Sequence, residues 1–175
     1  MNQSLTSYDF ALSYAHAFRV LLNKYYESRL SGNYQDFSLI VPLMSIGGFA
    51  CELFMKSLVD KKLKTHKLYS DLYKNLYTNI SNEIESIVVQ CMRLKKNKPD
   101  YDSLTFKFDF MKQDRLFEDF RYLYEPKKDK PQAVYNIDFT EVLVSTLQTI
   151  CELKFGKRPI TERQNDIEER KIIYE

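Results

Sequence analysis

The sequence predicts an all-α protein, an antiparallel bundle of about five helices that occupies residues 1–160 as one domain. Its 175 residues include only 4 Gly and 5 Pro, whereas a sheet-rich fold of this length needs many turns built from those residues. Apolar residues recur every three to four positions along most of the chain, which is the helical period. The hydrophobic fraction of 44% is sufficient for one buried core.

Two long helices are predicted in the first third of the chain, at about residues 5–30 and 37–62. Ser4 is a candidate N-cap for the first helix. The second is apolar on most sides, so we expect it to lie at the centre of the bundle. Its Gly47 and Gly48 lower the helix propensity, and we expect them to allow a neighbouring helix to approach closely.

The next predicted helix covers about residues 68–95, and polar residues near Ser81 and Asn82 can divide it in two. Glu83 and Glu85 would then lie in the first turn of the second piece, where the helix dipole favours anions. Residues 95–102 are basic and polar and contain a proline, so they are predicted to form a loop.

Residues 104–110 alternate between polar and apolar, which is locally a strand pattern. Because nothing else in the chain could pair with a single strand, we expect this stretch to begin a helix that continues to residue 124. A last helix is predicted from Asp138, which could form a capping box with Glu141, to residue 155, with Gly156 as its stop. For the charged tail, residues 161–175, the sequence is compatible with a short helix or with a mobile segment.

Composition excludes several classes of protein. The net charge of +2 provides no general basic field, so a nucleic-acid site would have to be a local patch. The 13 Tyr and 12 Phe side chains fit either a core between helices or a surface that stacks bases. The three cysteines match no zinc-binding spacing and are expected to be reduced core thiols. No metal and no cofactor is predicted.

The N-terminus lacks the basic and apolar pattern of a secretion signal. The longest apolar stretch, residues 39–58, is interrupted by Ser45, Glu52 and Lys56, so its uninterrupted part is too short to span a bilayer. We therefore expect a cytoplasmic protein with no membrane partner.

Two stretches resemble the HEPN family (higher eukaryotes and prokaryotes nucleotide-binding), whose fold is a helical bundle. The first is Ala50–Leu58 (ACELFMKSL), followed by His66, Lys67 and Leu68. The second is Phe117–Glu125 (FEDFRYLYE), which is similar to the Arg-Tyr-x-Tyr-Glu ending of many bacterial members. Both occur in the family's order with a final helix after them, and the resemblance covers roughly residues 7–155.

The resemblance implies a module of bacterial defence or toxin–antitoxin type, because the family includes metal-independent ribonucleases with those roles. These enzymes share an Arg followed by four to six residues and a His. The sequence departs from that pattern, since its only histidines are His16 and His66 and neither follows an arginine at that spacing. Any catalysis would therefore be that of an atypical ribonuclease.

Candidate catalytic residues are Arg121, His66 and Glu125. A guanidinium can hold a phosphate by two hydrogen bonds, and an imidazole beside a carboxylate can act as a general acid or base. The alternative interpretation of Arg121 is structural, as the partner of Glu52 across the bundle. Glu52 can also pair with Lys56 one helical turn away, and together with Tyr122 these residues form the predicted structural network.

Two basic runs are candidate phosphate contacts, and the alternative is that their lysines are ordinary solvated side chains. They contribute Lys61, Lys62, Lys64, Lys127 and Lys128. In a simple antiparallel bundle the loops at 61–67 and 125–136 share one end, and the loops at 32–37 and 96–102 share the other.

The sequence therefore supports three hypotheses of function. In the first, the chain is a dimeric HEPN-like module of defence or toxin type that acts on or binds RNA or nucleotide phosphate. In the second, it is a non-catalytic interaction module that forms a homodimer or binds a partner protein. In the third, it is a helical nucleotide-binding protein unrelated to defence.

Overall fold

Helices account for all the regular structure in the part of the chain that the computed structural model describes, which is residues 6–31, 37–59, 69–114, 116–121 and 135–157. The helices are α1 (Ser7–Leu30), α2 (Phe37–Leu58), α3 (Tyr69–Lys74), α4 (Thr78–Leu94), α5 (Ser103–Lys112), α6 (Leu116–Arg121) and α7 (Ile137–Phe155). The all-α prediction is confirmed for these residues. The tail predicted at 161–175 lies outside them.

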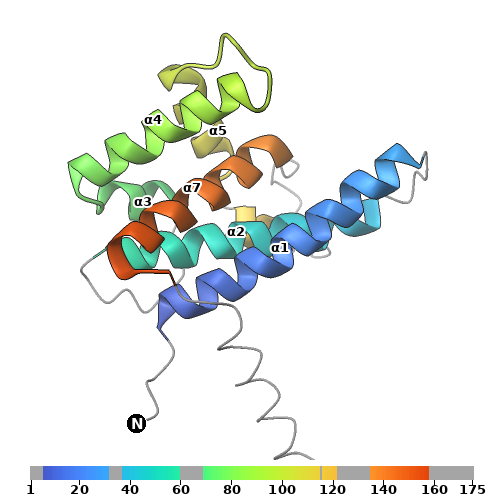
Figure 1. Ribbon diagram of the computed structural model, residues 1–175, viewed down its shortest axis with the longest axis horizontal. Coiled ribbons are helices and arrows are strands. Elements are labelled where there is room, and N and C mark those ends of the chain that lie inside the picture. The colour runs from blue at the N-terminus through green and yellow to red at the C-terminus, as the bar shows by residue number, and fades with distance from the viewer. Residues whose placement is uncertain (1–5, 32–36, 60–68, 115, 122–134, 158–175) are drawn as a thin grey trace, which may run out of the picture.

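α2 is the central helix of the structure, as its apolar sequence predicts. It packs against α1, α6 and α7, and α7 packs on its other side against α4. Figure 1 shows α1, α2, α7 and α4 following one another across the molecule. The side chains that are completely removed from solvent include Leu43, Met44, Phe54 and Leu58 of α2 and Leu147 of α7, so the core lies along the contact between these two helices.

The helices do not alternate in direction throughout. α1 and α7 are antiparallel, since Tyr8 contacts Gly156 and Tyr26 contacts Glu141. α2 and α7 run parallel, however, because Gly47 lies beside Thr140 and the Phe54 carbonyl lies 3.8 Å from the Cys151 thiol. The prediction of an antiparallel bundle is therefore only partly correct. The reason is that two short helices, α5 and α6, replace the single helix predicted at residues 104–124.

Gly47 and Gly48 allow three helices to approach α2 closely, as expected. A Cβ atom on Gly47 would lie 2.7 Å from the Phe18 ring of α1 and 2.9 Å from the Thr140 methyl group of α7. A Cβ atom on Gly48 would lie 2.9 Å from the backbone nitrogen of Phe117 in α6. The Gly48 carbonyl also accepts a hydrogen bond from the buried Tyr69 hydroxyl at 2.7 Å.

The predicted helix from 104 to 124 is interrupted, which is a correction. α5 ends at Lys112 and α6 begins at Leu116. Between them, the Asp114 carboxylate accepts hydrogen bonds from the Ser70 backbone N–H at 2.6 Å and from the Ser70 hydroxyl at 2.9 Å. Asp114 thereby caps the start of α3, and this long-range contact outweighs the local helical pattern. The alternating stretch before it is helical, as expected.

Three predicted helix starts also differ from the structure. α1 is capped by Thr6 in a capping box with Asp9, not by Ser4. α4 begins at Thr78, so its first turn contains no acidic residue, and Glu83 lies further inside the helix. The N-cap of α7 is Asn136, whose side chain accepts from the Phe139 N–H, so the predicted capping box of Asp138 and Glu141 does not form.

Cys51 and Cys151 are buried and, like Cys91, are free thiols. Burial raises the pKa of each buried thiol to about 12, so both are expected to stay protonated and unreactive at neutral pH.

By length and composition, residues 38–58 of α2 could cross a membrane, which differs from the expectation that the apolar stretch is too short. The same segment is the packed central helix of the bundle, and 56% of it is buried by the rest of the molecule. Burial of this kind is typical of a core helix, so the length alone assigns no location.

We predict that Gly47→Ala destabilises the protein, although alanine is the better helix former by about 1 kcal/mol. The added methyl group would overlap Phe18 and Thr140, and overpacking of this kind costs about 1–3 kcal/mol. The free energy of unfolding in urea measures the net effect. Ser145→Ala, at an exposed position of α7, is the control. An increase in stability for Gly47→Ala would contradict the close approach.

Candidate functional site

A cavity of about 470 Å³ opens where the second half of α1, the end of α5, the start of α7 and the loop after α4 meet. Cavities that bind small ligands usually measure roughly 300–1,000 Å³. We call it the α7 pocket. It is lined by Tyr25, Tyr26, Arg29, Lys98, Asp109, Lys112, Gln113, Tyr135, Asn136, Ile137 and Asp138.

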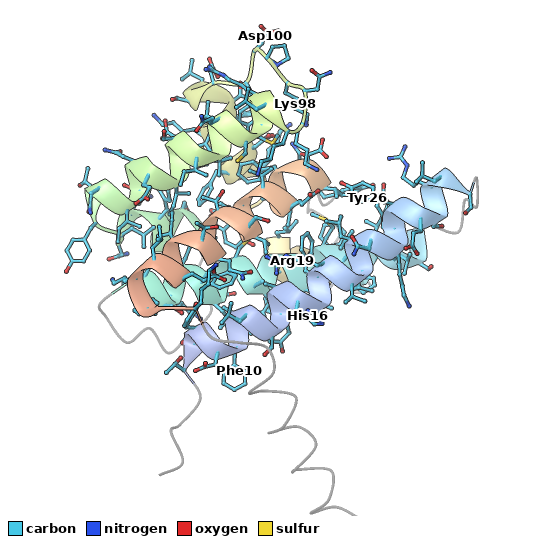
Figure 2. All side chains as sticks on the ribbon, in the orientation of Figure 1. Phe10, His16, Arg19, Tyr26, Lys98 and Asp100 are labelled. Atoms are coloured by element: carbon cyan, nitrogen blue, oxygen red, sulfur yellow. The ribbon has the colours of Figure 1, made fainter. Side chains whose placement is uncertain are left out.

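One wall of the α7 pocket is held by a charged network centred on Lys96. The Lys96 ammonium group and the Tyr26 hydroxyl both donate to the Glu141 carboxylate, the second at 2.9 Å. Burial lowers the pKa of Lys96. The Glu141 carboxylate, together with Tyr26 and Asp138, raises it by a larger amount, so the pKa of Lys96 lies above its usual value. Figure 2 shows Tyr26 on α1 and Lys98 on the loop after α4 at this end of the molecule. The network therefore fixes α1, α7 and that loop relative to one another.

Three cationic side chains line the α7 pocket, and each is held by a neighbour. The Arg29 guanidinium lies 5.9 Å from the centre of the Tyr25 ring. The Lys112 ammonium group lies 4.1 Å from the centre of the Phe108 ring. Lys98 pairs with Asp138 at 3.0 Å. Cations above rings keep their charge available to a ligand, because the ring does not neutralise them.

The two carboxylates of the α7 pocket already have partners. Asp109 accepts hydrogen bonds from the Tyr101 hydroxyl at 3.0 Å and from the Asn136 amide at 2.9 Å. Asp138 pairs with Lys98 and also lies 3.4 Å from Lys96. Burial raises the pKa of Asp138, but the hydrogen bond and charge of Lys98 and the charge of Lys96 lower it more, so the pKa lies below its usual value. Asp138 is therefore ionised at neutral pH and is not available as a general acid.

Gln113 lines the α7 pocket and is only 2% exposed. It follows the last residue of α5, and its backbone carbonyl accepts from the Leu116 N–H at 2.9 Å. Its side-chain oxygen lies 2.6 Å from the Thr140 hydroxyl. Within the part of the chain that the structure describes, its side-chain nitrogen has no hydrogen-bond partner, which is uncommon for a buried polar atom.

Most of the residues predicted for catalysis and phosphate binding lie outside the described part of the chain. These are His66, Glu125, Lys61, Lys62, Lys64, Lys127 and Lys128. Arg121 is the last residue of α6, and its side chain is not described. The catalytic assignment therefore stays a prediction.

Glu52 and Lys56 pair as their spacing predicts, with 2.7 Å between the Lys56 nitrogen and a Glu52 oxygen. Glu52 is buried in the central helix, and a buried carboxylate needs such a partner. The third predicted member of this structural network, Tyr122, is outside the described residues.

The predicted arrangement of loops is wrong at one point. The described end of the 125–136 segment, Tyr135 and Asn136, lies in the α7 pocket together with Lys98. The loop at 96–102 was expected at the opposite end of the bundle. The reason is the parallel arrangement of α2 and α7, which places the start of α7 near the end of α1.

None of the residues that line the α7 pocket was singled out as a site from the sequence. Two signals were present: an arginine one turn after Tyr25, and a run of lysines in the loop at 95–98. Asp138 was interpreted as a helix cap, whereas it pairs with that loop. Gln113 carries no sequence signal, because its burial arises from the break between α5 and α6.

Comparison of the chain with protein-family models, with curated proteins and with solved structures gives no match. The resemblance to the HEPN family consequently depends on the sequence motifs alone. Within the described residues, His, Cys, Asp and Glu side chains form no group of three or more that could hold a metal ion.

We predict that Asp138 stabilises the protein in a pH-dependent way. Because the pKa of Asp138 is lowered in the folded state, its contribution is complete above the unfolded value of about 3.9 and is lost as the pH falls through the folded pKa. Wild type should exceed Asp138→Asn in free energy of unfolding by a constant amount above about pH 5, and the difference should shrink below about pH 4.

Urea unfolding of both proteins across that pH range measures the difference. Asp100→Asn removes one exposed carboxylate from the same loop region and is the control (Figure 2). A difference between wild type and Asp138→Asn that stays the same down to about pH 2 would contradict the pairing with Lys98 and Lys96.

Proposed function

We propose that this chain is a HEPN-like helical module of bacterial defence or toxin–antitoxin type that binds RNA or nucleotide phosphate in the α7 pocket. The observation that carries the proposal is the combination of three cations with tyrosine rings around one cavity of suitable size. The family assignment comes from the sequence motifs, and the binding site comes from the geometry.

The chemistry of the α7 pocket suits a nucleotide. Arginine and lysine are the side chains that bind phosphate most often, and arginine can do so through two hydrogen bonds. Tyr26 and Tyr135 line the pocket, and a base can stack on an aromatic ring whatever the identity of the base. The partners of Asp109 and Asp138 reduce the repulsion that these carboxylates would exert on a phosphate.

Cleavage is a separate part of the proposal. An atypical ribonuclease would use Arg121, His66 and Glu125, with the 2′-hydroxyl group of RNA as the nucleophile. None of these side chains is among those that the structure describes, so the assignment of binding to the α7 pocket does not use them. A denaturing gel of tRNA incubated without metal, with wild type beside Arg121→Ala, tests the catalytic part, and cleavage by neither protein would refute it.

We predict that Arg29→Ala and Lys112→Ala each weaken the binding of adenosine monophosphate by roughly fivefold or more, because each removes a charge-assisted contact to phosphate. Isothermal titration calorimetry measures the dissociation constants. With a short single-stranded RNA, each change should also reduce the slope of log affinity against log salt by about one.

Lys107→Ala is the matched control, since it removes an exposed lysine of α5 that does not line the α7 pocket. Equal affinity for wild type and both pocket variants would place any nucleotide site elsewhere. Absence of binding by wild type would refute the proposed function.

A second candidate function is that of a dimerisation module without catalysis. α5 buries Phe106 and Phe110 but exposes Leu104, Phe108 and Met111. The exposed residues are four and three positions apart, so they form one apolar stripe along the solvent face of the helix. Large apolar side chains gathered in this way are typical of a contact surface, and a second copy of the chain is the partner we expect.

We predict that Leu104→Ser shifts a dimer of this kind toward monomer, because it removes apolar area from the interface. Sedimentation velocity across a concentration series measures the shift. Leu153→Ser is the control, since Leu153 on α7 is 76% exposed and Leu104 is 74% exposed. A wild-type chain that is monomeric at all concentrations would refute this candidate, as would an equal shift in both variants.

A further inference from the structure

The Gln113 side chain is held in a position where its amide nitrogen has no acceptor among the described residues. Its position is fixed by the break between α5 and α6 and by the Thr140 hydroxyl at 2.6 Å. Thr140 is itself packed against Gly47. A buried donor without a partner reduces the stability of the folded state, so the fold would be better served by an apolar side chain at this position.

The Thr140 hydroxyl cannot remove this deficit. It has one hydrogen and lies within hydrogen-bond distance of two acceptors, the Gln113 side-chain oxygen and the Asn136 carbonyl at 3.0 Å. The hydroxyl lies against the side-chain oxygen of Gln113, so it leaves the nitrogen at the other branch of the amide unsatisfied. In the orientation that the structure shows, that nitrogen has no partner among the described residues.

The start of α7 supplies further donors beside Gln113. Asn136 caps the helix by accepting from the Phe139 N–H at 3.1 Å. The N–H groups of Ile137 and Asp138 belong to the first turn and have no acceptor within the helix. Both residues line the same pocket as Gln113, and the positive end of the helix dipole lies there as well.

We infer that Gln113 is a specificity-determining residue, and that its amide N–H donates to a phosphate group bound at the start of α7. The inference rests on the proposed function and deepens it, because it assigns the phosphate of the nucleotide to one part of the pocket. Lys98 lies next to this position through its pair with Asp138, and Arg29 and Lys112 line the same cavity. The base is then directed toward the tyrosine rings.

The test is the Gln113→Met variant, which keeps the length of the side chain and removes both polar atoms. Isothermal titration calorimetry compares wild type and variant with three probes: inorganic phosphate, adenosine monophosphate and adenosine. Thermal unfolding without ligand measures stability. Gln90→Met is the control, since Gln90 is exposed on α4 and does not line the α7 pocket.

We expect Gln113→Met to weaken binding of inorganic phosphate and of adenosine monophosphate by roughly tenfold and to leave binding of adenosine unchanged. We also expect the ligand-free variant to melt at or above the temperature of wild type, because an unsatisfied buried group has been removed. The Gln90→Met control should match wild type in all measurements.

Four results would overturn the inference. Equal affinity of wild type and Gln113→Met for the phosphate probes would remove Gln113 from the site while the proposed function stands. A loss confined to adenosine would place the base, not the phosphate, at α7. A large fall in melting temperature would make Gln113 a structural residue. If wild type binds none of the probes and no RNA, the proposed function fails and the inference with it.

Discussion

The close contact of three helices with Gly47 and Gly48 is the constraint on which the rest of the structure depends. A side chain at Gly47 would collide with Phe18 of α1 and Thr140 of α7, and one at Gly48 would collide with the backbone of α6. The glycines reduce the intrinsic stability of the central helix, and the packing that they permit compensates for this loss. Because Thr140 is fixed by this contact, Gln113 and the start of α7 are fixed as well, so the geometry of the α7 pocket follows from the glycine pair.

The α7 pocket combines rigid walls with polar groups that the fold does not need. The Lys96 network joins α1, α7 and the loop after α4 through the Glu141 carboxylate, which holds the opening in one shape. Inside it, the Gln113 nitrogen lacks a partner among the residues whose positions are described. Sites that bind ligands commonly retain such unfavourable groups, because the ligand supplies the missing interaction. Because the α7 pocket combines rigid walls with an unsatisfied polar group, we assign ligand binding to this pocket and not to the exposed apolar stripe on α5.

The long helices were predicted well from local patterns. Apolar periodicity, and a glycine pair that permits close helix contact, can both be recognised within a few consecutive residues. The central position of α2, the role of Gly47 and the pairing of Glu52 with Lys56 all follow from spacing alone. The α7 pocket could not be predicted in this way. It depends on the break that Asp114 creates between α5 and α6 and on the parallel packing of α2 and α7, and both arise from contacts between residues far apart in the sequence. For the same reason Asp138 was interpreted as a cap, although its partner is a lysine 40 residues earlier.

The most direct test of the account is a nuclear magnetic resonance titration of the ¹⁵N-labelled protein with adenosine monophosphate. We propose that the phosphate of the nucleotide lies between the Gln113 side-chain amide and the first turn of α7. The Gln113 side-chain signals and the backbone amides of Ile137 and Asp138 should therefore shift together and saturate with one dissociation constant. The side-chain amide of Gln90, which lines a different hollow beside α4 and the start of α5, should not move. Shifts confined to other parts of the chain, or none at saturating ligand, would contradict the assignment of the α7 pocket as the binding site.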